Sequence, residues 1–332
     1  MNSLTHGITV YALLALVGMA AGALISALIF TLGRRWLLEC PPAIRARLLL
    51  ALLLCPVIAA LALMLGMSAP GSFFSVGEIS AHCGSQGGMH YSFCQWHAPQ
   101  ITLPQWLIYP MLLVVGLIVA VAGRAVLRMH RAQQRMRFIR HLARPQPAGH
   151  YLLPMQKPAA FAAGLLRGQA FVSEGLVQRL QPEQLEIVLA HEHAHVAHRD
   201  MLLTLVANAL AKVQLPWVGK TLRNDWHLAV EQRCDEEVAR QTGNRVAVAD
   251  CLLHVARLQS ASYFSPATPG ACHLMDGDLP TRICALLREP GQTRLAPALS
   301  IGSLELMALA GVLLAGPHIH HWMEILLPGG GM

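Results

Sequence analysis

The chain has 332 residues, of which 54% are hydrophobic and only 13% are charged. Soluble domains carry about 25% charged residues, so this composition excludes an ordinary soluble protein and indicates a membrane protein with a soluble part. The formal net charge of +7 comes mostly from arginine. These arginines lie directly beside apolar segments, as topology determinants do, which argues against direct nucleic-acid binding.

The first apolar segment, residues 8–32, contains no charged residue. It is long enough to span a bilayer with some tilt, and it lacks the basic leader of a signal peptide, so we expect a retained helix. Gly18, Gly22 and Ser26 recur at four-residue spacing. This pattern either lets a second helix approach closely or reflects the general abundance of small residues in such helices.

Two further spans complete a predicted membrane region over residues 1–123. The second span, 48–67, tolerates Pro56 as a kink, and the third, 101–123, begins with aromatic interface anchors. Arginines follow the first and third spans, whereas residues 68–100 contain no lysine or arginine. The positive-inside rule therefore predicts the N-terminus outside, the loop 68–100 outside, and the chain from residue 124 inside.

The extracytoplasmic loop 68–100 holds Cys83 and Cys94, for which we predict a disulfide. The eight cysteines of the chain form no C-x-x-C pair, which argues against a zinc ribbon or a thioredoxin-like motif. If the thiols stayed reduced, the loop could instead bind a soft metal such as copper through these cysteines and His82, Met89, His90 and His97. Whether it senses a ligand or a metal is left open.

Residues 124–290 form the only stretch long enough for a domain core. Short runs broken by proline and glycine predict strands of a small sheet at 151–154, 159–163 and 170–173. Helical patterns follow at 182–200, 226–238, 246–259 and 280–287. The sequence therefore predicts an α+β domain.

The helix at 182–200 contains the motif H-E-x-x-H. His191 and His195 are four residues apart, so both imidazoles can reach one Zn²⁺ from the same helix face, with Glu192 beside them as the general base. His198 lies on this face as well, but a third ligand from one helix would need a turn that no glycine provides. His193 points elsewhere, and we expect neither to bind the metal.

A zinc site of this kind needs a third ligand. Glu231, on the next charged helix, is our prediction, and Asp235, four residues later, is well placed to hold the other ring nitrogen of a ligating histidine. The apolar stretch 201–213 lies between the two motifs. A single crossing there would separate the ligands across the membrane, so we expect a core helix or one lying in the interface.

Residues 295–316 predict a fourth span that leads outward, followed by a short extracytoplasmic tail, 317–332. Glu305 lies at the centre of this span. An ionisable group at that depth is costly. It is either a functional candidate or a neutral glutamic acid packed inside the bundle.

The segments Phe171–Leu180, Leu185–Asp200 and Glu231–Asp235 resemble the M56 peptidases, the family of the BlaR1 and MecR1 antibiotic-sensing transducers. They are also similar to the neighbouring M48 family, the Ste24 and HtpX type. The E-x-x-C-D form and the order of spans favour M56. The resemblance implies one zinc ion at His191, His195 and Glu231, with Glu192 as base. It also implies a cytoplasmic repressor as the substrate.

Two features depart from these families. The antibiotic sensors carry a penicillin-binding domain after the fourth span, which this sequence does not show, so we expect any signal to enter through the loop 68–100, the membrane helices or a partner. The M48 pattern has a Thr-His-Pro element before an Arg-Ile pair, and none precedes Arg282-Ile283. The oxyanion-stabilising residue is therefore left open among His227, His254 and His273.

The sequence thus predicts a four-span polytopic α-helical protein of a bacterial inner membrane, with a cytoplasmic gluzincin-like zinc metallopeptidase domain between spans 3 and 4. Its partners are the lipid bilayer and a protein substrate. We expect a signalling protease. The alternatives are an M48-like quality-control protease of membrane proteins and a non-enzymatic membrane scaffold. Whether the chain forms a homodimer is left open.

Overall fold

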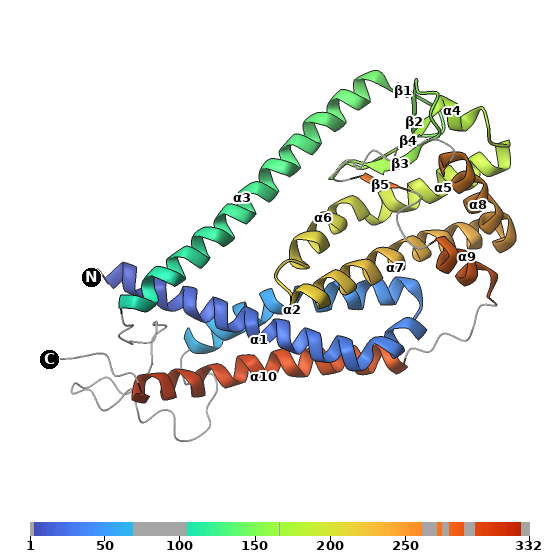
Figure 1. Cartoon of the computed structure of the whole chain (residues 1–332). Helices are drawn as coiled ribbons and strands as arrows, with labels where there is room; N and C mark the ends of the chain where they lie inside the picture. The colour runs from blue at the N-terminus through green and yellow to red at the C-terminus, as the bar shows by residue number, and fades with distance from the viewer. Residues whose placement is uncertain are drawn as a thin grey trace.

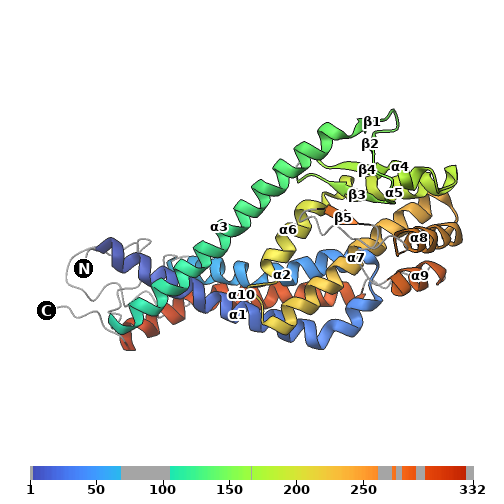
Figure 2. The ribbon, with the colours of Figure 1, turned by 45° about the horizontal axis from the view of Figure 1, so that its top comes forward.

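A computed structural model describes residues 3–68, 105–165, 167–260, 271–273, 279–288 and 296–326. Three long helices, α1 (Ser3–Glu39), α2 (Pro42–Ser68) and α10 (Ala296–Leu326), lie side by side as a bundle (Figure 1). The 38-residue helix α3 (Gln105–Leu142) leaves one end of this bundle and leads to a small sheet, as Figure 2 also shows. Two of the remaining helices, α6 (Asp200–Leu210) and α7 (Pro216–Thr242), lie between the sheet and the bundle (Figure 1).

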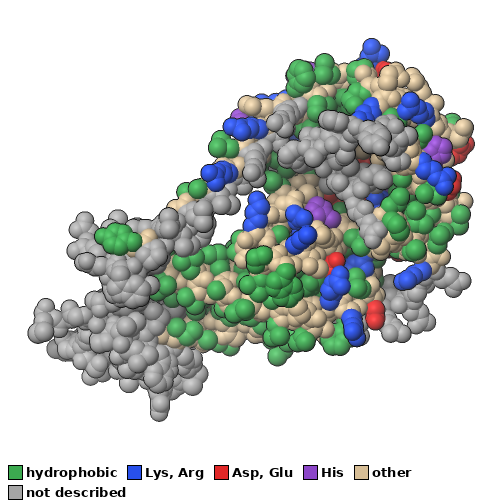
Figure 3. Space-filling model, in the orientation of Figure 1, with side chains coloured by type: hydrophobic (Ala, Val, Ile, Leu, Met, Phe, Trp, Pro, Cys, Tyr) green, Lys and Arg blue, Asp and Glu red, His purple; other side chains and the backbone are tan. Residues whose placement is uncertain are grey.

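Among the described residues, three helices are long and apolar enough to cross a membrane, over Tyr11–Glu39, Pro42–Gly66 and Ala298–Gly316. They correspond to three of the four expected spans. The expected span 101–123 falls partly outside the described residues and partly on α3, which continues as one helix to Leu142. A fourth crossing and the orientation of the chain stay predictions. Figure 3 shows hydrophobic side chains across the visible face of the bundle.

The small residues of α1 lie against α2, so their four-residue spacing reflects a close approach of the two helices. A Cβ added at Gly18 would lie 2.5 Å from the Cα of Ala60, and one at Gly22 would lie 2.6 Å from the Cα of Pro56. The hydroxyl of Ser26 donates to the carbonyl of Leu52 at 2.9 Å. The two helices can therefore approach each other closely only because these positions are small.

The sheet has five strands in the order β1-β2-β4-β3-β5: β1 (Arg144–Pro145), β2 (His150–Leu153), β3 (Ala160–Ala163), β4 (Gln169–Ser173) and β5 (Ala271–His273). Strands β2 and β4 pair in parallel, with Tyr151 opposite Phe171, and the other pairs are antiparallel. The three predicted strands are confirmed as β2, β3 and β4. The edge strands β1 and β5 were not predicted, since neither has the alternating pattern of a strand.

Six helices accompany the sheet: α4 (Glu174–Val177), α5 (Pro182–His198), α6 (Asp200–Leu210), α7 (Pro216–Thr242), α8 (Arg245–Ser260) and α9 (Leu279–Leu287). Helix α5 begins at a proline and a capping box between Gln181 and Gln184, whereas α7 ends at Gly243 with a φ of +67°. Both are ordinary helix signals. Helix α7 begins ten residues before the predicted 226, because Pro216 starts it.

Two apolar cores meet along α7. One core joins the sheet to α5, α7, α8 and α9, with Ala160, Val172, Val188 and Val238 among its buried members. The other core joins α6 and α7 to the bundle, and it comprises Ala27, Ile29, Phe30, Leu37, Ala46, Leu49, Leu52, Leu53, Ala207, Val218, Leu222, Trp226, Ala229, Val230 and Ile301. Helix α7 thus packs on the bundle along its first half and on the sheet layer along its second.

We predict that Gly22→Ala separates α1 from α2 and lowers the stability of the protein by about 1–3 kcal/mol, the usual cost of overpacking. Thermal unfolding in detergent, followed by tryptophan fluorescence, measures the change. Gly302→Ala is the matched control, because its Cβ would lie 3.8 Å from Leu48, an ordinary contact. Equal midpoints for the two variants would contradict close packing at Gly22.

Candidate metal centre

Helix α5 presents two imidazoles to one point. His191 and His195 are one turn apart and are 2% and 0% exposed. Their Nε2 atoms lie 3.1 Å from each other, with the rings edge to face. Two ring nitrogens this close cannot both carry protons that point at one another. The pair is therefore suited to share a cation.

Helix α7 brings the carboxylate of Glu231 to the same point. Its two oxygens lie 3.4 Å from the Nε2 of His191 and 3.4 Å from the Nε2 of His195. Nitrogen and oxygen ligands at about 2.05 Å from a tetrahedral zinc ion lie about 3.3 Å apart. The three separations of 3.1, 3.4 and 3.4 Å fit that geometry. The three predicted ligand residues thus come together as a buried cluster that could hold a metal ion.

Glu192 provides a buried carboxyl group beside the two histidines. It is fully buried, and neither carboxyl oxygen has a hydrogen-bond partner among the described residues. Burial raises the pKa of Glu192 to about 7, although the two neighbouring histidines act against the shift. A carboxyl group with a pKa near neutrality can accept a proton and release it again. An uncompensated acid in this position is costly for folding, which is typical of a functional group.

Asp235 and Arg282 support the ligands from one side. Asp235 lies 3.1 Å from the Nδ1 of His191, as its spacing on the helix suggested. Arg282, on α9, donates to both Asp235 oxygens at 2.7 and 2.8 Å and lies 2.9 Å from Glu231. Burial alone would raise the pKa of both acids, but Arg282 and the neighbouring histidines together outweigh burial and lower the pKa of each. Both carboxylates therefore stay ionised.

Asp200 and Arg233 support the second histidine, His195, in the same way as Asp235 and Arg282 support His191. Arg199 ends α5 in the left-handed conformation, with φ +56° and ψ +37°, and this turn brings Asp200 back to the Nδ1 of His195 at 2.8 Å. Arg233 donates to both oxygens of Asp200 at 2.5 and 2.6 Å. Carboxylates that hold ligating histidines fix the tautomer and raise the basicity of the ligand. Each imidazole thus has its own carboxylate and guanidinium.

Sequence reasoning missed Asp200, Arg233 and Arg282. The signal for Asp200 was an acid directly after the helix that carries the motif. The signal for Arg282 was its place in the Arg282-Ile283 pair. The sequence analysis considered this pair only because no Thr-His-Pro element precedes it. Arg233 carried no signal, because an arginine on a charged helix usually faces water.

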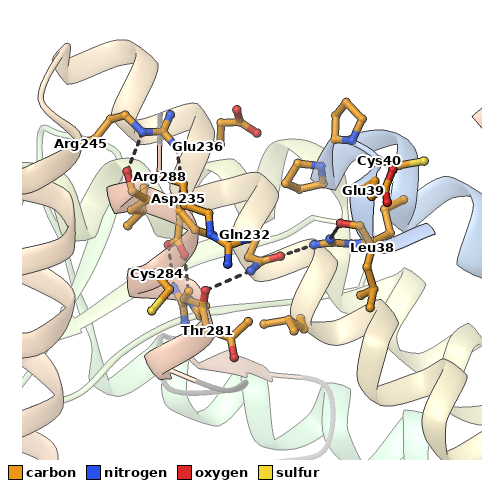
Figure 4. A pocket seen from close by; sticks show the side chains of 17 residues that line it. Leu38, Glu39, Cys40, Gln232, Asp235, Glu236, Arg245, Thr281, Cys284 and Arg288 are labelled. Carbon is orange, nitrogen blue, oxygen red and sulfur yellow. Dashed lines mark hydrogen bonds and ion pairs between the residues drawn. The ribbon is translucent and has the colours of Figure 1, made fainter. Parts of the chain in front are cut away.

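A cavity of about 510 Å³ lies beside this support, between the α1–α2 turn and helices α7 and α9 (Figure 4). Asp235 and Arg282 line it. Figure 4 shows Gln232 reaching across it: its carbonyl oxygen accepts from Arg45 of α2, and its amide donates to the Thr281 carbonyl at 3.4 Å. The part of α7 that carries Glu231 and Asp235 is thereby tied to both the bundle and α9.

The other predicted residues lie apart from this cluster or outside the described residues. His198 is exposed and pairs with Glu237 at 2.9 Å, and His193 lies 3.4 Å from the Gly149 carbonyl. His227 lies edge to face with Trp226 on α7, His254 lies on α8 and His273 on β5. Glu305 is 6% exposed on α10. Its role, like that of the three histidines, stays a prediction. Cys83 and Cys94 fall outside the described residues.

Two histidines from one helix, a glutamate from a second helix and a free buried carboxyl group are the arrangement of zinc metallopeptidases of the His₂Glu type. The comparisons with known proteins agree with this class. The model of Peptidase family M48 matches residues 127–261. This segment contains the three clustered residues and Glu192.

Three similar curated proteins are named as HtpX proteases. The chain is 40% identical to the Protease HtpX homolog of Syntrophobacter fumaroxidans over 106 residues, 28% of this chain and 37% of that protein. It is 37% identical to Protease HtpX homolog 1 of Streptomyces coelicolor over 101 residues, 28% and 32% of the two chains. It is 44% identical to the Protease HtpX homolog of Aquifex aeolicus over 63 residues, 18% and 21%. The chain thus spans well under half the length of these relatives. No solved structure matches it significantly.

The expected resemblance to M56 transducers is therefore wrong, and the comparisons support the M48 family instead. The ligand motif is common to both families and could not separate them. Cys234, which had favoured M56, is a fully buried side chain 3.5 Å from the Nδ1 of His195. Its complete burial gives this cysteine a packing role, which does not separate the two families.

Asp200→Asn should weaken zinc binding by about 10- to 100-fold, the usual effect of losing a carboxylate behind a ligating histidine. Competition with a chromogenic chelator measures the affinity of the purified protein. His198→Ala is the control, because His198 pairs with Glu237 and should not affect the metal. Unchanged affinity in Asp200→Asn would show that His195 needs no support from this side.

Arg282→Met should destabilise the folded state by about 3–5 kcal/mol, because it leaves two buried carboxylates without their shared cation. Arg282→Lys should recover part of the loss, since an ammonium keeps the charge but not the bidentate geometry. Thermal unfolding of the metal-free protein gives the comparison. Arg240→Met, at an exposed site on α7, is the control. If Arg282→Met unfolded with the wild type, the ion pairs would contribute nothing.

Proposed function

We propose that the chain is a zinc-dependent endopeptidase of the M48 type that cleaves proteins at a membrane. The observation that carries the proposal is the triangle of ligand atoms from His191, His195 and Glu231 next to the unpartnered carboxyl group of Glu192. The three helices long and apolar enough to cross a membrane support the location. The match to Peptidase family M48 supports the reaction.

In this proposal His191, His195 and Glu231 hold the zinc ion. When bound, zinc polarises the scissile carbonyl and acidifies water at neutral pH. Glu192 takes the proton from the attacking water and passes it to the leaving amine, for which a pKa near 7 is suited. Asp235 and Asp200 keep the two imidazoles in the tautomer with Nε2 free. Arg282 holds Glu231 in place and keeps it ionised.

A substrate segment would bind in extended form along the sheet edge. Strand β5 pairs with β3 on one side, and within the described residues no strand pairs with its other side. Such an edge can accept a further strand through main-chain hydrogen bonds, which recognise a backbone and not a particular sequence. This mode favours a protease with broad substrate choice.

We therefore place the quality-control alternative, a protease that cleaves many membrane proteins, before the signalling protease. The similarity to proteins named Protease HtpX homolog supports this order. Comparing new protein N-termini in cells that express the wild type or Glu192→Gln tests it. Cuts in many membrane proteins would support quality control. One or two cuts in a cytoplasmic regulator would favour the signalling protease, and no cuts together with no bound zinc would favour the scaffold.

Glu192→Gln should lower the cleavage of an unfolded test protein by at least about 10²-fold, because general-base catalysis contributes that much or more. Zinc content should stay at the wild-type level, since Glu192 is not among the proposed ligands. Both are measured on purified protein in detergent. Glu186→Gln, an exposed acid on the same helix, should behave as wild type. A fully active Glu192→Gln variant would rule out this mechanism.

A further inference from the structure

The turn that joins α6 to α7 lies against the bundle, far along α7 from the metal centre. We call residues 211–217 the hairpin tip. Figures 1 and 2 both show it over the middle of the α1–α2 pair, where α2 is a candidate membrane span. We propose that the hairpin tip enters the lipid leaflet nearest the metal centre, with Val213 and Trp217 among acyl chains and Lys212 and Lys220 at anionic headgroups.

The depth of the hairpin tip follows from an ion pair. Arg34, near the end of α1, pairs with Asp225 of α7 at 2.9 Å. Clustered arginines at the end of an apolar helix mark the level of the headgroups. Pro216 begins α7 nine residues before Asp225, a rise of about 13 Å along the helix axis. The hairpin tip therefore lies on the hydrocarbon side of that level.

A buried hydrogen bond independently places the hairpin tip on the hydrocarbon side. The Gln214 amide donates to the carbonyls of Leu52 at 2.9 Å and Leu53 at 3.4 Å. Pro56 has no N–H, so the Leu52 carbonyl has no partner within its own helix. Leu52 lies five residues beyond Arg47, about 7 Å into the span by helix rise. A free carbonyl there would be unfavourable in lipid, where no water can satisfy it. Gln214 and Ser26 supply its donors.

The outer surface of the hairpin tip fits a lipid boundary. Trp217 is 59% exposed and Val213 is 39% exposed, although both are apolar. Tryptophan is enriched where a protein crosses from headgroups to acyl chains. Lys212 and Lys220 are exposed on either side of them, and long lysine side chains can reach headgroups from a backbone that lies deeper. An apolar centre with flanking lysines matches an anionic leaflet better than a protein groove.

This placement has a consequence for the metal centre. Glu231 lies six residues beyond Asp225, about 9 Å along the helix axis on the side away from the hairpin tip. The hairpin tip in lipid and the Arg34–Asp225 pair at the headgroups would hold the centre just outside the membrane surface. Peptide segments that leave the membrane would then meet it first.

Quenching by brominated lipids tests the proposal with the full chain in nanodiscs. Subtracting the fluorescence of Trp217→Phe from that of the wild type isolates the emission of Trp217. Lipids brominated near the headgroup end of the acyl chain should reduce this emission by at least half, and acrylamide in the water should not. Trp36→Phe, which removes another exposed indole at the end of α1, is the matched comparison.

Emission that bromine leaves unchanged would overturn the proposal. If acrylamide quenched it, the hairpin tip would lie in water, and if neither did, a protein surface would cover it. The lysines have their own test. With bromine only on phosphatidylglycerol, the wild type should be quenched more than with bromine only on phosphatidylcholine. Lys212→Gln/Lys220→Gln should lose this preference, whereas Lys157→Gln should keep it. A wild type without preference would contradict the headgroup contact. None of these readings depends on peptidase activity.

Discussion

Charge compensation inside the protein determines how the metal centre is built. Four buried carboxyl groups surround the two imidazoles: Glu192, Asp200, Glu231 and Asp235. Arg233 and Arg282 supply two positive charges in direct contact with three of them. With neutral imidazoles and all acids ionised, this set carries two net negative charges, the amount that one divalent cation neutralises. Without a cation, protonation of Glu192 would relieve one charge, which agrees with its raised pKa.

The same constraint explains why four helices must meet. Helix α5 carries the two imidazoles and Glu192, α6 begins with Asp200, α7 carries Glu231, Asp235 and Arg233, and α9 carries Arg282. A histidine pair on one helix is easily formed, but an arginine that serves two carboxylates needs a separate element on the opposite side. Helix α9 fills this position, and Leu286 anchors it in the core beside α8.

The sequence was most informative where spacing alone fixes geometry. His191, His195, Glu231 and Asp235 could be found because helical periodicity brings residues four apart to one face. The apolar helices and three strands could be found for the same kind of reason. Asp200 and Arg282 could not, because their contacts depend on a left-handed turn at Arg199 and on the packing of α9. Strand β5 depends on its pairing with β3, which the local sequence pattern does not predict. The family was misjudged because both candidate families need the same ligands.

Helix α7 both packs on the bundle and carries the third candidate ligand, Glu231. Its first half buries Val218, Leu222 and Trp226 against the bundle, and its second half presents the third ligand residue. A rigid helix transmits its position from one end to the other, so docking on the bundle also fixes where Glu231 lies. Packing of the bundle and the position of the third candidate ligand are therefore coupled through one continuous helix.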